Sequence, residues 1–108
     1  MNVIGGAGEF TGTGVNWVEH LRVADLSVGT YSVAAGGTDS QEPHTEDEIY
    51  LVTRGRAVLE SAGHQVAVGP GSVIYVPAGE VHRFTEIAED LAVIVVFAPA
   101  EYSRARTG

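Results

Sequence analysis

The chain has 108 residues, a hydrophobic fraction of 44% and a formal net charge of −8, and all of its basic residues are arginines. This length fits one domain, and the composition is that of a folded globular protein. The acidic balance disfavours nucleic-acid and membrane-surface partners, and the absence of cysteine excludes disulfides, zinc–thiolate sites and thiol nucleophiles.

The N-terminal segment, residues 1–14, contains five glycines and few residues that could pack, so we expect a flexible glycine-rich arm. It lacks the basic region followed by an apolar run that marks a secretory signal. The longest apolar stretch, Leu91–Ala100, is about half the length that spans a bilayer. We therefore expect a cytoplasmic protein.

Residues 15–100 form a series of short segments rich in β-branched and aromatic residues, separated by glycine and proline. Short, closely spaced strands with turn signals between them indicate a sandwich or barrel. A polar C-terminal tail is expected over residues 101–108. The predicted strands are Leu26–Ala35, Glu48–Thr53, Arg56–Ser61, Gln65–Val68, Ser72–Val76, Val81–Glu86 and Leu91–Ala98.

Five acidic residues lie between positions 39 and 48 without a basic residue among them: Asp39, Glu42, Glu46, Asp47 and Glu48. The ordinary interpretation of such a run is a solvated face, and we apply it to Glu46 and Asp47. The remaining carboxylates require a separate argument.

The first candidate ligand segment places Glu42, His44, Glu48, Tyr50 and Val52 at positions of one parity. Alternate residues of a strand share a face, so inward-facing Tyr50 and Val52 would bring Glu48 and His44 inward as well. An unpaired buried charge costs several kcal/mol or more. A divalent cation would remove that cost, and imidazole with carboxylate suits iron, manganese, nickel or zinc.

The second segment begins at Gly71, ends a strand in the turn Pro77-Ala78-Gly79 and resumes with His82. His82 shares its parity with Phe84. We expect the turn to reverse the chain so that His82 faces inward.

The two segments resemble the two motifs of the cupin superfamily. The first motif has a glycine, five residues, a histidine–any–histidine pair, three or four residues, a glutamate, six residues and a glycine. This chain matches it with Gly36, Glu42, His44, Glu48 and Gly55, and Glu42 replaces the first histidine.

The second motif has a glycine, five residues, Pro-any-Gly, two residues, a histidine, three residues and an asparagine. Gly71, Pro77, Gly79 and His82 keep every spacing, and Glu86 stands in the place of the asparagine. The resemblance implies an all-β fold with a single antiparallel β-barrel over residues 15–100, of the cupin or jelly-roll type known as the double-stranded β-helix.

The resemblance also implies a metal site with Glu42, His44, Glu48 and His82 as ligands to a divalent transition metal (Mn, Fe, Ni or Zn). The Glu42 carboxylate either coordinates the metal or lies outside the coordination sphere with water in its place. Gln41 is a further candidate, although its parity is opposite to that of His44.

Cupins include dioxygenases, isomerases, decarboxylases and lyases, so the resemblance implies a small-molecule enzyme without selecting its reaction. A dioxygenase-like oxidoreductase is the first hypothesis, with Glu42 moving a proton and Tyr50 as the second candidate catalytic residue. The alternative is a non-catalytic module that binds a small molecule or a metal. A homodimer is expected because cupins commonly pair and this core is small.

Overall fold

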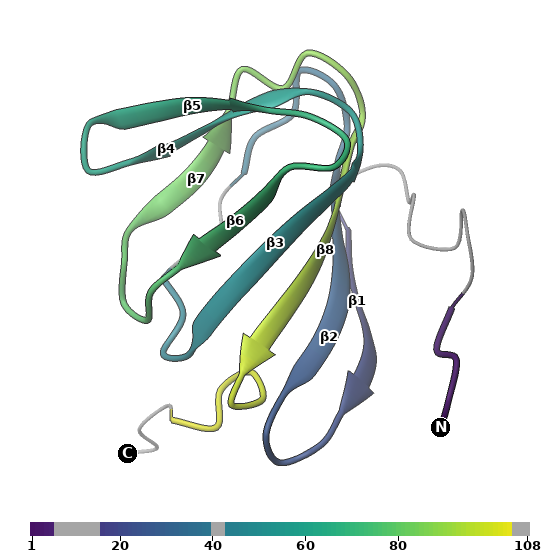
Figure 1. The fold of residues 1–108 in the computed structure, drawn as a ribbon. Helices are drawn as coiled ribbons and strands as arrows, with labels where there is room; N and C mark the ends of the chain where they lie inside the picture. Colours follow the sequence, from purple (N-terminus) through teal and green to yellow (C-terminus); the bar gives the residue numbers. More distant parts are fainter. Residues whose placement is uncertain (6–15, 40–42, 105–108) are drawn as a thin grey trace.

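The computed structural model describes residues 1–5, 16–39 and 43–104, and the secondary structure within them consists of β-strands and turns (Figure 1). The strands are β1 (Asn16–Arg22), β2 (Ser27–Val33), β3 (Asp47–Arg54), β4 (Ala57–Ser61), β5 (His64–Val68), β6 (Val73–Val76), β7 (His82–Thr85) and β8 (Leu91–Ala98).

The strands form two antiparallel sheets that face each other (Figure 1). The larger sheet has the order β1-β2-β8-β3-β6, and the smaller has the order β5-β4-β7. The all-β, antiparallel prediction is confirmed. The predicted single antiparallel β-barrel is corrected to two facing sheets, because backbone pairing among the described strands does not join the sheet edges into one ring.

All seven predicted strands are present, with bounds that differ by no more than two residues. β1 was not delimited from the sequence, and it pairs with β2 at the edge of the larger sheet. The N-terminal arm expected over residues 1–14 falls mostly outside the described residues. No helix of the described chain is long and apolar enough to cross a membrane.

Side chains along β3 and β8 alternate between inward and outward. The inward residues of the two strands pair with each other and build much of the core. Tyr50 pairs with Val95 and Val52 with Val93, and all four residues are buried. Ile49, one position away from Tyr50, is 41% exposed. Period-2 alternation therefore holds along β3, and it places Glu48, opposite Phe97, in the interior between the sheets.

Candidate metal centre and adjoining cavity

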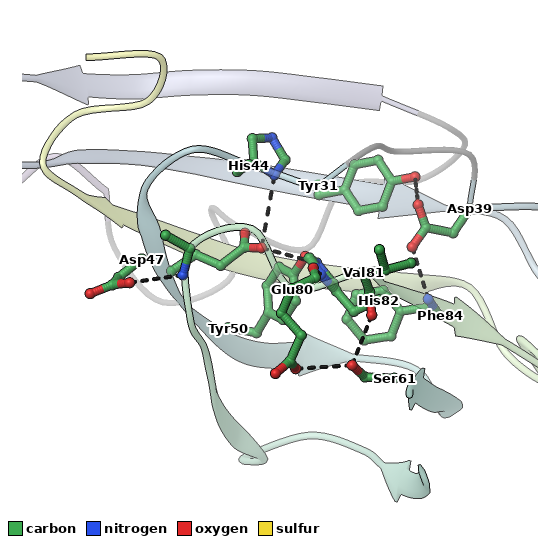
Figure 2. Close-up of polar contacts among 12 residues, drawn as sticks. Tyr31, Asp39, His44, Asp47, Tyr50, Ser61, Glu80, Val81, His82 and Phe84 are labelled. Carbon is green, nitrogen blue, oxygen red and sulfur yellow. Dashed lines mark hydrogen bonds and ion pairs between the residues drawn. The ribbon is translucent and has the colours of Figure 1, made fainter. Parts of the chain in front are cut away.

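The turn between β6 and β7 lies within the second motif. Its hydrogen bonds to residues of the first motif position His82. Gly79 has a φ of 79°, a left-handed conformation that glycine adopts without steric cost. Its amide donates to the His44 carbonyl at 2.8 Å, and the Ala78 amide donates to Asp47 Oδ1 at 2.8 Å. Figure 2 shows Asp47 beside this turn. The turn therefore fixes the start of β7 against the start of β3.

His82 and Glu48 meet in the interior, where both are almost completely buried. His82 Nε2 lies 2.9 Å from Glu48 Oε1 and 2.7 Å from the Tyr50 hydroxyl, which approaches from the same strand as Glu48 (Figure 2). His82 Nδ1 lies 2.8 Å from the Glu80 carbonyl oxygen, to which it donates. This cluster confirms the inward parity predicted for Glu48, Tyr50 and His82.

The electrostatics of this cluster favour a positive charge on His82. Burial alone lowers the pKa of His82, but the hydrogen bonds to Glu48 and to the Glu80 carbonyl outweigh burial and raise it. An imidazolium donates from both ring nitrogens, which matches acceptors at Glu80 and Glu48. The carboxylate and the carbonyl thus favour the protonated form of His82.

His44 lies on the other side of Glu48, at a longer distance. Its Nδ1 is 3.8 Å from Glu48 Oε1, beyond hydrogen-bond range, and its Nε2 is 3.0 Å from Glu101 Oε2. His44 Nδ1 and Glu48 Oε2 are buried without a hydrogen-bond partner among the described residues. Buried polar atoms of native proteins normally have partners, so this pair indicates a group that completes the cluster.

Imidazole and carboxylate donors fit a divalent transition metal, and the two unpartnered atoms are of the correct types. Within residues 1–5, 16–39 and 43–104, however, no group of three or more histidine, aspartate or glutamate side chains is arranged as a metal site. Glu42, the predicted fourth ligand and catalytic residue, lies outside the described residues, as does Gln41. The donor chemistry fits a metal, and the predicted ligand set is described only in part.

Asp39, which was left unassigned from the sequence, supports the cluster through hydrogen bonds from residues of β2 and β7. Its side chain is buried, with Oδ1 accepting from the Tyr31 hydroxyl at 2.8 Å and Oδ2 from the Phe84 amide at 2.8 Å (Figure 2). Phe84 is two residues after His82, so Asp39 fixes the strand that carries the imidazole.

Glu46 was interpreted from the sequence as part of a solvated face, and this interpretation is wrong. Its side chain is buried, and its carboxylate accepts from the amides of Tyr102 and Arg104 at 2.6 and 3.0 Å and from the Thr45 hydroxyl. These hydrogen bonds lower the pKa of Glu46 against the effect of burial, which raises it. Glu46 therefore holds the turn after β8 against the start of β3.

This turn brings Glu101 to His44. The Glu101 amide donates to Ser27 Oγ at 2.9 Å, and Arg22 Nη1 donates to the Glu101 carbonyl at 2.8 Å. Burial raises the pKa of the Glu101 carboxyl above its ordinary value, although the neighbouring His44 acts to lower it. Glu101 was expected at the start of a polar tail and was not predicted as a site residue.

An open cavity of about 370 Å³ adjoins His44. Four aromatic side chains line it, together with Pro43 and Val95, and the His44–Glu101 pair supplies its polar wall. The aromatic side chains are Trp17, Tyr31, Phe97 and Tyr102.

The chain thus consists of two facing antiparallel sheets with a histidine–carboxylate cluster between them. A family model described as the cupin domain matches residues 29–98. The chain therefore belongs to the cupin superfamily, as a small single-domain member. An uncharacterized protein of Streptomyces coelicolor, SCO3923, is 49% identical over 85 residues, which cover 79% of this chain and 81% of that protein.

Two solved structures show the same fold. An RmlC-like cupin family protein with a double-stranded β-helix fold, from Methanocaldococcus jannaschii, has a TM-score of 0.74 and 14% identity, covering 92% of this chain and 91% of that one. The DMSP lyase DddQ from Ruegeria pomeroyi has a TM-score of 0.67 and 22% identity, covering 80% of this chain and 42% of that one. At these identities the likeness concerns the fold alone.

Proposed function

We propose that this cupin is a metal-dependent enzyme acting on a small molecule, with His44, Glu48 and His82 as ligands of a divalent transition metal and Glu42 as a fourth candidate. The observation that carries the proposal is the pair of unpartnered buried atoms, His44 Nδ1 and Glu48 Oε2, beside a 2.9 Å contact between His82 and Glu48. A cation ligated there would satisfy groups that are otherwise costly to bury.

A bound divalent metal supplies Lewis acidity, which polarises a substrate carbonyl or lowers the pKa of a water molecule. The chain's own residues orient the ligands. The Glu80 carbonyl accepts from His82 Nδ1 and directs Nε2 inward, and Glu101 occupies Nε2 of His44. Such outer partners fix the tautomer and ring orientation of ligating histidines. The Tyr50 hydroxyl lies 2.7 Å from His82 Nε2 and is the candidate proton donor beside them.

The reaction class stays among oxygenase, isomerase and lyase types, and a dioxygenase-like oxidoreductase stays the first hypothesis. DddQ is a DMSP lyase with this fold, which supports an enzyme in general terms. The second candidate function is a non-catalytic binding module. The aromatic cavity favours it, because that cavity alone suffices to hold a small molecule.

Elemental analysis of the full chain, purified without added metal, tests the proposal. We expect a stoichiometric transition metal in the wild type and its loss in His44→Ala and Glu48→Ala. The matched control is His64→Ala, because His64 is an exposed histidine on β5. Metal-free wild-type protein that takes up no Mn, Fe, Ni or Zn would contradict the proposal. Metal uptake without consumption of any candidate substrate under oxygen would favour the binding module.

The cytoplasmic location and the homodimer expected from the sequence remain proposals. We expect the partners to be small-molecule ligands. We do not expect nucleic acid or a membrane as a partner, because the net charge of −8 would repel their anionic surfaces. Sedimentation of the full chain at micromolar concentration would distinguish a dimer from a monomer.

A further inference from the structure

The cavity beside His44 has a wall that is aromatic or apolar over most of its described residues, the exceptions being His44 and Glu101. The hydroxyl of Tyr31 donates to Asp39 at 2.8 Å, so the polar group of this wall residue already has its partner (Figure 2). The cavity volume of about 370 Å³ lies within the range of sites that hold small organic molecules. Burial of apolar surface is therefore the main interaction that this cavity offers a ligand.

One ring of the wall, Trp17, lies against the backbone of β2 because Gly29 has no side chain. A Cβ atom at Gly29 would lie 2.3 Å from Cη2 of Trp17 and 2.5 Å from Cζ2, closer than side chains approach one another. A glycine inside a strand weakens the strand, and it often marks a close approach of this kind. β2 therefore accommodates the indole ring at a cost in strand stability.

The rings of the wall extend from the interior to the cavity mouth. The Trp17 and Phe97 rings meet edge to face with their centroids 6.1 Å apart, and the Phe97 centroid lies 4.6 Å from that of His44. Phe97 is 2% exposed, whereas Tyr102 is 64% exposed and its ring lies 6.1 Å from the His44 ring. Aromatic rings prefer edge-to-face and offset contacts with other rings, which add to the effect of burial. An aromatic ligand could make such contacts along the whole cavity.

The polar groups of the wall give a charged ligand little compensation. Among the lining residues that the structure describes there is neither arginine nor lysine, so an anion finds no cationic side chain. Oε2 of Glu101 lies 3.0 Å from His44 Nε2, so this carboxyl group already has a hydrogen-bond partner, whichever of the two residues carries the proton. An ion that enters the cavity would lose its hydration without a free partner, which is costly, whereas an uncharged molecule avoids that cost.

We propose that this cavity binds an uncharged aromatic molecule, whose ring lies among Trp17, Phe97 and Tyr102. As a statement about the substrate class of the enzyme, this inference rests on the proposed function, because the cavity adjoins His44. As a statement about binding, it rests on the cavity alone.

Three probes with the same ring and different charge at neutral pH test the first part of the inference: benzyl alcohol, benzylamine and benzoate. The chain has one tryptophan, Trp17, and it lines the cavity, so its fluorescence reports binding in the full-length protein. We expect benzyl alcohol to bind at least about tenfold more tightly than the cation or the anion to metal-free protein. An ion that binds as tightly as the alcohol, or no saturable change with the alcohol, would overturn the proposal.

A fourth probe, cyclohexylmethanol, tests the aromatic part, because it has a six-membered ring without a π-system. Tyr102→Leu preserves apolar contact and removes a ring of the wall, so it should weaken benzyl alcohol a few fold more than cyclohexylmethanol. The matched control is Tyr75→Leu, because Tyr75 is a similarly exposed tyrosine on β6, outside the described lining, and both affinities should stay unchanged. Equal losses for the two probes in Tyr102→Leu, or the same differential loss in Tyr75→Leu, would overturn the assignment.

The titrations are carried out on protein treated with EDTA and again after addition of manganese. Preference for benzyl alcohol in a protein that takes up no metal would end the proposed metal enzyme and leave the aromatic site intact. Metal uptake without this preference in the metal-free protein would end the assigned ligand class alone.

Discussion

The partly buried Tyr31 and the buried Asp39 form a hydrogen-bonded pair beside the site. Burial and the 2.8 Å hydrogen bond to Asp39 both raise the pKa of the Tyr31 phenol above its ordinary value. The folded protein therefore holds the phenolic proton more tightly than the unfolded chain does. Its contribution to stability is complete below a pH of about 10 and is lost as the pH rises through the folded-state pKa.

We predict that Tyr31→Phe is less stable than the wild type at pH 8 by about 1–3 kcal/mol, because the buried Asp39 carboxylate loses a hydrogen-bond donor. Above pH 10 the difference should narrow by about 1.4 kcal/mol per pH unit, because phenylalanine has no proton to lose. Urea unfolding of both proteins at pH 8 and pH 11 measures the two differences. A difference that stays constant with pH would contradict the argument.

Glu86 has a φ of 47° and follows β7 as an exposed residue. The left-handed region is unfavourable for most residues with a side chain, and asparagine is among those that tolerate it best. The asparagine of the cupin motif, which Glu86 replaces, therefore suits a backbone requirement at this position.

We predict that Glu86→Asn raises the free energy of unfolding by about 1 kcal/mol, because it relieves this backbone strain. Glu89→Asn, in the same loop, makes the same chemical change where φ is not positive, and it should alter stability very little. Equilibrium urea unfolding of the two variants provides the comparison. Equal effects would attribute any gain to charge and not to conformation.

At the scale of elements, the turn after β8 is held in place by a residue at the start of β3. Glu46 accepts hydrogen bonds from the Tyr102 and Arg104 amides, and this contact sets the position of Glu101 against His44. The C-terminal turn is therefore coupled to the candidate site through one carboxylate.

We predict that Glu46→Gln destabilises the protein by about 1–3 kcal/mol, because a neutral amide offers one acceptor oxygen where the carboxylate offers two. Hydrogen exchange followed by NMR should show faster exchange at the Tyr102 and Arg104 amides, with little change within β8. Glu60→Gln on β4, a partly exposed strand position, is the control and should leave these amides protected. Unchanged protection in Glu46→Gln would mean that the turn is held by other contacts.

The sequence predicts the strands and the inward residues well because both depend on local pattern. Alternation along β3 places Glu48 and Tyr50 inward, and the turn at Gly79 does the same for His82. Glu101 could not be identified in this way, because its contact with His44 joins residues far apart in sequence. Glu46 was misassigned for the same reason, since its partners follow β8 and a run of acidic residues gives no local sign of them.

At the scale of the whole molecule, the 108-residue fold buries an unusual number of carboxylates for its size. Asp39, Glu46, Glu48 and Glu101 are each no more than 6% exposed. Asp39 and Glu46 are satisfied by amide and hydroxyl donors. Glu48 and Glu101 instead lie against histidines, and Glu48 Oε2 has no hydrogen-bond partner among the described residues.

We predict that a divalent transition metal stabilises the whole protein through Glu48. A ligand present at 100 times its dissociation constant stabilises a fold by about 2.7 kcal/mol, which for a domain of this size raises Tm by on the order of 10 °C. Thermal melts with EDTA and with Mn, Fe(II), Ni or Zn measure the shift. Glu48→Gln should abolish it, whereas Glu89→Gln should retain it, because Glu89 is exposed and lies before β8. A shift of equal size in Glu48→Gln would show that the metal binds elsewhere, because the amide cannot replace the carboxylate as a charged ligand.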